Sequence, residues 1–250
     1  MPAGEYGWAA GASAAAHVFV PALGDECVVE GDDGHHLQRV RRLRAGETVT
    51  AADGTGAWRV YEIVDVAAGR LELLARGSAL LEPELQPRLC VALALTKDRS
   101  LDDVVGGLTE LGVHRIEPVR SSRSVVRWDD RRAAAAVERL RAVAREAAMQ
   151  SRRARVMEIT PVCDLASLRG RPGLVVADRR GSPAGQVSLA PSEEIVIVVG
   201  PEGGLAPDEV SLLDAPRVSV GQHVLRARTA PLAVVAAFHQ HTTPVPHVVN

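Results

Sequence analysis

The spacing of hydrophobic residues divides the chain into two regions of different fold class. In the first region, short apolar segments are separated by turn signals such as Asp53-Gly54 and Ala68-Gly69, which is typical of short β-strands. A helix is expected at about 33–43, with Asp32 as its N-cap. The strands are expected at 17–20, 27–30, 47–52, 57–66 and 70–75. This set of elements predicts a small β-barrel.

From residue 88 onward, apolar strands alternate with segments of helical spacing. The run 89–95 is continuously apolar, as expected of a parallel strand buried on both faces. A long helix begins at Asp129 or Asp130 and continues to about residue 150. Further strands are expected at 115–119, 156–160, 174–177, 195–199 and 218–220, and further helices at 100–111, 207–213 and 229–238. This alternation predicts an α/β domain whose parallel sheet is covered on both faces.

These patterns predict a disordered tail at 1–16 and two domains, at 17–80 and 88–250, joined by a linker at 81–87 that two prolines interrupt. With 46% hydrophobic and 24% charged residues, the composition is that of a globular protein. Three widely spaced cysteines argue against a disulfide framework or a cysteine-based zinc site and fit a reducing cytoplasm. No segment fits a signal peptide or a membrane span. We therefore expect a soluble, cytoplasmic protein without metal or membrane partners.

Charge is distributed unevenly although the formal net charge is only −2. Residues 120–155 hold eleven arginines and four acidic residues, and residues 35–44 hold four arginines and two histidines without an acid. Such clusters indicate contact with a polyanion. A solvated helix face is the alternative interpretation.

The strongest candidate for a ligand site follows the strand at 195–199. Gly200-Pro-Glu-Gly-Gly-Leu205 leads into a helix with Pro207 near its start. Ligands of open α/β sheets bind beyond the carboxyl ends of the strands, and Gly203 and Gly204 let the backbone approach a ligand closely. Glu202 would repel a pyrophosphate but tolerates a cationic or hydroxyl-bearing ligand such as S-adenosylmethionine (SAM). A plain strand-to-helix turn is the alternative.

A second candidate follows the strand at 218–220. An irregular segment from Gly221 to Arg228 precedes a helix that Thr229 is placed to cap. A cation such as Arg228 beside a helix N-terminus is unfavourable by ~0.3–1 kcal/mol. A nearby anion such as an RNA phosphate would offset this cost, and an arginine pointing into solvent would avoid it.

These two segments, in this order, resemble the RsmE family, the 16S rRNA (uracil-N3)-methyltransferases of the SPOUT superfamily. The loop Val199–Leu205 matches the family's G-P-E-G-G loop without change, and Gly221 and Leu225-Arg226 follow it as in the family. Three further stretches are similar to family motifs: 36–46 to H-x-x-R-V-L-R-x-x-x-G, 109–113 to E-L-G-V, and 150–155 to E-Q-x-x-R.

The resemblance implies a SPOUT-type domain with a trefoil knot, a PUA-like N-terminal barrel, and a homodimer packed through the knot. It implies SAM as methyl donor and the RNA of the small ribosomal subunit as partner. The residues expected to hold SAM are Val199, Gly200, Pro201, Glu202, Gly203, Gly204, Leu205, Val220, Gly221, Leu225 and Arg226. The residues expected to contact RNA are His36, Arg39, Arg42, Arg123, Arg153, Arg155 and Arg228.

The chain departs from the family pattern at several positions. Ala227 and Arg228 replace Thr and Glu beside the expected active site, and Met149, Met157 and Gly107 replace Glu, Pro and Lys elsewhere. The changes at Ala227 and Arg228 bear directly on activity.

Arg226 is the candidate catalytic residue. A fixed guanidinium would stabilise charge that develops on the carbonyl oxygens of uracil, and a structural ion pair is the alternative role. No histidine or carboxylate stands out as general base. Three functions therefore remain open: methylation of rRNA, methylation of another RNA such as tRNA, and RNA or ribosome-assembly binding without catalysis, which Ala227 and Arg228 favour.

Overall fold

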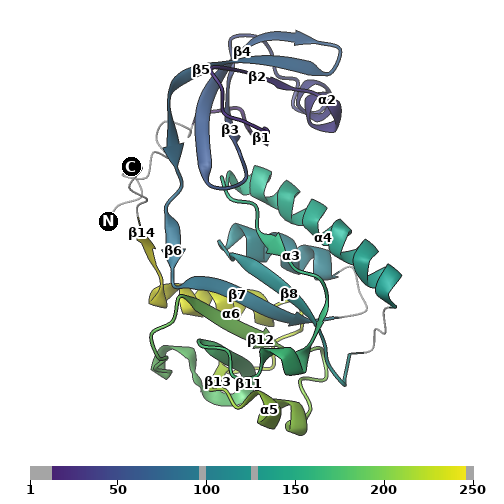
Figure 1. The fold of residues 1–250 in the computed structure, drawn as a ribbon, viewed down its shortest axis with the longest axis vertical. Helices are drawn as coiled ribbons and strands as arrows, with labels where there is room; N and C mark the ends of the chain where they lie inside the picture. Colours follow the sequence, from purple (N-terminus) through teal and green to yellow (C-terminus); the bar gives the residue numbers. More distant parts are fainter. Residues whose placement is uncertain (1–12, 96–99, 125–128, 246–250) are drawn as a thin grey trace. The chain divides into compact units, whose positions relative to one another are not determined.

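The computed structural model describes residues 13–95, 100–124 and 129–245 (Figure 1). Their contacts form two compact units, one built from residues up to 84 together with 148–156, the other from 85–147 and 157–245. Residues 1–12 of the expected N-terminal tail lie outside the described residues. Ala14 and Ala16 of the same stretch are buried, so this end of the expected tail is part of the first unit.

The first unit contains a five-stranded sheet with the order β1-β3-β4-β5-β2. Its strands are β1 Ala16–Phe19, β2 Glu26–Val29, β3 Thr48–Ala52, β4 Ala57–Ala67 and β5 Arg70–Leu81. β1 pairs with β3 in parallel, and the other pairs are antiparallel. Alternating residues such as Tyr61 and Ile63 point into a core to which Leu37 of helix α2, Gly31–Arg39, also belongs. The five strands and one helix predicted from the sequence are confirmed.

Local boundaries differ from the prediction for identifiable reasons. Helix α2 begins after Glu30, not after Asp32, and ends at Arg39; Arg42 adopts a left-handed conformation with φ 56°, which no helix can continue through. The expected linker at 81–87 is wrong in part, because 84–86 forms strand β6, which pairs with β14, Thr243–Val245. This ladder has only two strands, where flanking prolines are tolerated.

The second unit is built on a parallel sheet with the order β10-β8-β7-β12-β11-β13, and β9 pairs with β8. The strands are β7 Arg88–Ala94, β8 Arg115–Arg120, β9 Glu158–Ile159, β10 Cys163–Asp164, β11 Leu174–Pro183, β12 Glu194–Val199 and β13 Arg217–Ser219. All of these pairs are parallel. The predicted parallel α/β sheet is therefore confirmed.

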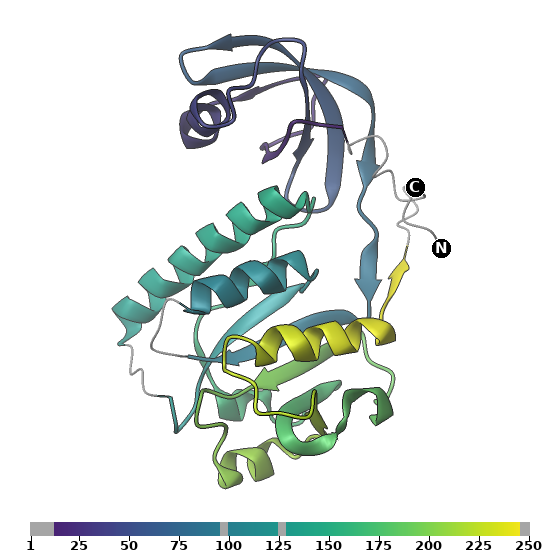
Figure 2. The same ribbon diagram turned by 180° about the vertical axis from the view of Figure 1, so that it is seen from behind.

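Both faces of this sheet are covered, as Figures 1 and 2 show from opposite sides. Val91 and Ile197 share one core with helices α3 Ser100–Glu110, α4 Asp130–Ser151 and α6 Ala230–Phe238. Cys90 and Val198 belong to the other core, with the 3-10 helix η2 Leu165–Leu168 and helix α5 Pro207–Leu213. The short 3-10 helices η3 Ala184–Gln186 and η4 His239–His241 complete the unit. Alternate residues of the central strands thus belong to two separate apolar cores, one on each face of the sheet.

An ionic network ties the amino ends of the central strands together. Arg115 at the start of β8 donates to both carboxylate oxygens of Glu194 at the start of β12, at 2.9 and 2.5 Å, and to Glu117 at 3.0 Å. Arg171, just before β11, binds Glu117 at 2.6 Å. The hydrogen bonds from Arg115 lower the pKa of Glu194. This edge of the sheet is fixed by charge pairing, whereas the carboxyl edge carries loops.

His17 connects the first unit's sheet to its 148–156 segment. The residue is 7% exposed. Its Nε2 donates to the carbonyl of Arg153 at 3.0 Å, and Nδ1 faces the Thr50 hydroxyl at 2.8 Å. Burial lowers the pKa of His17 to about 4. The imidazole is therefore neutral at neutral pH.

Acidification is expected to destabilise the first unit through His17. Since the unfolded chain binds a proton near pH 6.5 and the folded one only near pH 4, stability falls as pH drops through this window, by up to about 3 kcal/mol. Denaturant unfolding between pH 7 and 4 measures this loss. A His17→Gln variant is expected to show a smaller loss, because it has no group to titrate. An identical pH dependence in both proteins would contradict this assignment.

Candidate functional site

Three neighbouring strands of the second unit end at the same edge of the sheet. β11 lies between β12 and β13 and pairs with both in parallel, so their carboxyl ends point in one direction. The loop 200–206 follows β12, the segment 220–229 follows β13, and a bulge at 178–181 interrupts β11. The fold therefore places the two predicted ligand segments at one edge.

The two ends of the Gly200–Leu205 loop lie close together. The N–H of Gly204 donates to the carbonyl of Pro201 at 2.8 Å, and Gly204 has φ 66°, a conformation that favours glycine. A Cβ on Gly200 would lie 2.9 Å from the nitrogen of Leu205. Val199 and Pro201 are buried, whereas Glu202, Gly203 and Gly204 are exposed. The glycine tip of the loop is therefore exposed to solvent.

Side chains outside the loop bind its backbone. Nη1 of Arg123, which follows β8, donates to the carbonyls of Gly203 at 2.9 Å and Leu205 at 3.3 Å. The Glu209 carboxylate in the first turn of α5 accepts the N–H groups of Ala206 at 2.8 Å and Ser122 at 2.6 Å. Arg123, expected to contact RNA, thus makes two bonds within the candidate site.

The segment after β13 is more open. Gly221 has φ 72°, Val220 and Leu225 are half-buried, and Arg226 is exposed. The carbonyl of Arg226 accepts the N–H of Ala230 at 2.9 Å, which begins α6. Thr229 occupies the predicted N-cap position, but its hydroxyl makes no capping bond, so that part of the prediction is wrong.

Arg226 and Arg228 carry the guanidinium groups of this segment. Both side chains are exposed, and neither takes part in a hydrogen bond or ion pair with another of the described residues. The ion-pair alternative for Arg226 therefore has no contact to support it within this part of the chain.

The expected RNA-contact residues of the first unit fall into two groups. His36, Arg39 and Arg42 are exposed on and just after α2. Arg155 instead donates to the carbonyls of Thr55 and Glu82, while burial lowers the pKa of Arg153 and the nearby Glu82 charge raises it. The guanidinium groups of Arg153 and Arg155 therefore interact with groups of their own unit.

The bulge in β11 brings residues to this edge that the sequence analysis missed. Ala177 and Ser182 both lie in register with Val218, so 178–181 is an excursion from the ladder. The Asp178 carboxylate accepts the N–H of Arg180 at 2.9 Å. Arg179 and Arg180 are exposed, as is His223 on the segment after β13. The signal for the bulge is the run Asp178-Arg179-Arg180 directly after the apolar residues Leu174–Ala177.

Two departures from the family pattern lie in packed regions. A Cβ on Gly107 would lie 2.8 Å from a methyl carbon of Leu232 in α6, so the space of a larger side chain is occupied. Met157 is buried, and its sulfur lies 3.9 Å from the Thr109 hydroxyl. Gly107 therefore packs against α6, and Met157 lies against Thr109 of α3.

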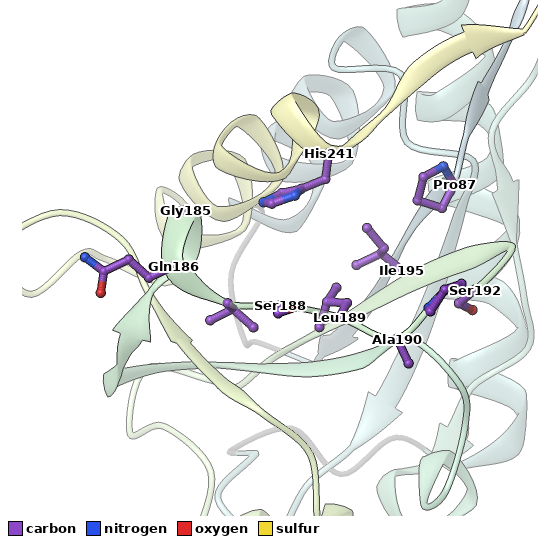
Figure 3. Close-up of a pocket in the computed structure, with 11 residues that line it drawn as sticks. Pro87, Gly185, Gln186, Ser188, Leu189, Ala190, Ser192, Ile195 and His241 are labelled. Atoms are coloured by element: carbon purple, nitrogen blue, oxygen red, sulfur yellow. The ribbon is translucent and has the colours of Figure 1, made fainter.

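A cleft of about 630 Å³ lies at the opposite edge, near the starts of β7 and β12 (Figure 3). Its lining residues are Pro87, 185–192, Ile195 and His241, none of which is an expected site residue. Among the described residues there is no group of three or more histidine, cysteine or acidic side chains placed to hold a metal. None of the described helices combines the length and apolar character needed to span a membrane.

Known proteins match this chain along most of its length. The RNA methyltransferase domain family matches residues 83–239, and the RNA methyltransferase PUA domain family matches 29–74. Ribosomal RNA small subunit methyltransferase E of Mycobacterium bovis is 35% identical over 231 residues, 87% of each chain. The protein of the same name from Bacillus subtilis is 31% identical, covering 86% of this chain and 90% of its own.

A solved structure has the same fold. The crystal structure of ribosomal RNA small subunit methyltransferase E from Neisseria gonorrhoeae, bound to S-adenosyl methionine, has a TM-score of 0.78 and 27% identity. The match covers 90% of this chain and 97% of that one.

Substitution of Gly200 is expected to disrupt the loop. In Gly200→Ala the new Cβ would meet backbone atoms of Leu205 and Gly204 at 2.9 and 3.0 Å, and relieving this overlap is expected to cost about 1–3 kcal/mol. Gly203→Ala is the matched control, since its Cβ would lie 3.8 Å from Arg123. Denaturant unfolding measures both variants. Equal stability of the two would contradict the loop geometry.

Proposed function

The chain belongs to the ribosomal RNA small subunit methyltransferase E family, and we propose that it methylates N3 of a uridine in 16S rRNA with SAM as methyl donor. The observation that carries this proposal is the Gly200–Leu205 loop, whose exposed glycine tip stands at the carboxyl edge from which the segment after β13 also leaves the sheet. The relative from Neisseria, which has the same fold, binds the same donor.

The residues at this edge fit SAM. The exposed Gly203 and Gly204 leave room for close approach of a ligand, and the exposed Glu202 carboxylate suits an ammonium or ribose hydroxyls. When bound, SAM supplies a methyl group on a sulfonium. We assign its binding to the loop Val199–Leu205 and to Val220, Gly221, Leu225 and the backbone of Arg226, which leaves the exposed Arg226 guanidinium to the uracil.

The reaction replaces the N3 proton of uracil with a methyl group. The N3–C bond forms as the S–C bond breaks, the proton leaves to solvent or to a base, and S-adenosylhomocysteine is released. Negative charge develops on the carbonyl oxygens beside N3. We assign its stabilisation to Arg226, because this exposed guanidinium is not engaged by another described residue. Orientation of the two substrates supplies the remaining acceleration.

Binding of RNA is assigned to arginine side chains of both units and to His36. His36, Arg39, Arg42 and Arg228 are exposed and available to phosphates. Arg179 and Arg180, on the β11 bulge, extend this set at the carboxyl edge. Arg123, Arg153 and Arg155 belong to the expected set, but for Arg123 and Arg155 a phosphate would compete with carbonyls that each guanidinium already binds.

The resemblance to the RsmE family extends the proposal to assembly and location. We propose that the second unit carries the trefoil knot, that two copies pack through it, and that the protein acts in the cytoplasm. The domain limits 17–80 and 88–250 belong to the same proposal, with residues 148–156 of the second domain packing in the first unit.

Transfer of a labelled methyl group from SAM to small ribosomal subunits that lack the modification tests the proposed function. We expect 3-methyluridine, identified by mass spectrometry of the digested RNA. Labelling of tRNA, or of another nucleoside, would replace this function with methylation of a different target. Binding of SAM without transfer would favour a non-catalytic RNA-binding protein, for which Ala227 and Arg228 are the supporting observation.

Arg226→Ala is expected to lower kcat by about a hundredfold or more while leaving the Kd for SAM within a fewfold of the wild type. The reason is that Arg226 stabilises charge that forms on the uracil as its N3 proton leaves, and this charge is absent from the complex with SAM alone. Arg228→Ala is the contrasting variant, since loss of a phosphate contact raises KM for the subunit and leaves kcat unchanged. Turnover by Arg226→Ala equal to that of the wild type would remove Arg226 from its role.

A further inference from the structure

The tip of the Gly200–Leu205 loop has little packing to hold its shape, whereas Pro201 is buried and Leu205 packs against the core. Glu202, Gly203 and Gly204 are exposed, and a single turn closed by the N–H of Gly204 shapes the tip. Glycine loses more backbone freedom on ordering than any other residue. A loop that binds a ligand through its backbone therefore needs contacts from elsewhere to fix it.

Two charged side chains supply these contacts. The two bonds from Arg123 reach the carbonyls of Gly203 and Leu205, on either side of Gly204. The two bonds to Glu209 come from Ala206, at the end of the loop, and from Ser122, beside Arg123 in the chain. Hydrogen bonds with one ionised partner are about twice as strong as neutral ones. The connection after β8 is thus tied to both the tip and the end of the loop.

These bonds are poorly placed to stabilise the fold as a whole. Arg123 is exposed, and exposed charged contacts contribute little to the free energy of unfolding. Glu209 is half-buried, and its bond to Ala206, the N-cap residue of α5, also stabilises the start of that one short helix. Their effect falls on the loop, whose bound conformation they fix in advance. Pre-ordering a binding loop raises affinity because the ligand no longer has to order it.

We infer that Arg123 and Glu209 are positioning residues that set the affinity of the Gly200–Leu205 loop for SAM. The inference rests on the proposed function, in which this loop holds the methyl donor. Neither side chain needs to touch SAM or the uridine. Arg123, which the sequence places in a basic RNA-binding segment, serves the cofactor loop instead.

Isothermal titration of the full-length protein with SAM tests the inference without any RNA. Glu209→Ala and Arg123→Ala are each expected to raise the Kd for SAM about tenfold. Glu209→Gln and Arg123→Lys, which keep part of the bonding, are expected to lie between. Asp208→Ala is the matched control and should bind as the wild type does, because Asp208 is an exposed carboxylate of the same helical turn without a bond to the loop.

Steady-state methyl transfer separates positioning from general loss of structure. The alanine variants are expected to raise KM for SAM and to keep kcat at saturating SAM within about twofold of the wild type, whereas partial unfolding would lower kcat. A Kd within twofold of the wild type removes that residue from the role, and an equal effect of Asp208→Ala overturns the inference. If the wild type does not bind SAM, the proposed function fails and the inference with it. Wild-type binding with unaffected variants overturns the inference alone.

Discussion

Burial of both faces of the strands β7 and β12 is the constraint on which the rest of the second unit depends. Alternate residues of these strands belong to two separate apolar cores, so the strands must be parallel neighbours covered by helices on each side. Every loop that leaves the sheet in the forward direction then emerges at the same edge. The Arg115–Glu194 ion pair joins strands at the opposite, amino edge. The candidate site lies at the carboxyl edge.

The main elements were readable from the sequence because their signals are local. Helix α5 begins at Pro207 and ends at Leu213 as predicted, and strand β12 differs from its prediction by one residue. The sequence does not show that residues 148–156 pack in the first unit. Their local pattern predicts secondary structure but does not indicate which unit they contact. Strand β6 was missed since its partner β14 lies at the other end of the chain.

The candidate site was predicted unevenly for a similar reason. The glycine loop is recognisable in the sequence as a short motif after an apolar strand. The side chains that bind its backbone, in contrast, come from positions far away in the sequence. Arg123 lies 80 residues before Gly203, and a run of arginines gives no sign of which guanidinium groups bind backbone carbonyls. The basic character of residues 120–155 therefore overstates the charge available to RNA, since Arg123, Arg139, Arg141 and Arg155 bond within the chain.

The central claim is that the methyl donor binds at the carboxyl edge and not in the cleft at the opposite edge. Hydrogen–deuterium exchange of the full-length protein with and without SAM tests this claim most directly. The account predicts that SAM slows exchange of backbone amides at 200–206 and 220–226 and leaves 185–195 unchanged. Protection confined to 185–195, which includes the cleft-lining residues 185–192 and Ile195, would contradict it.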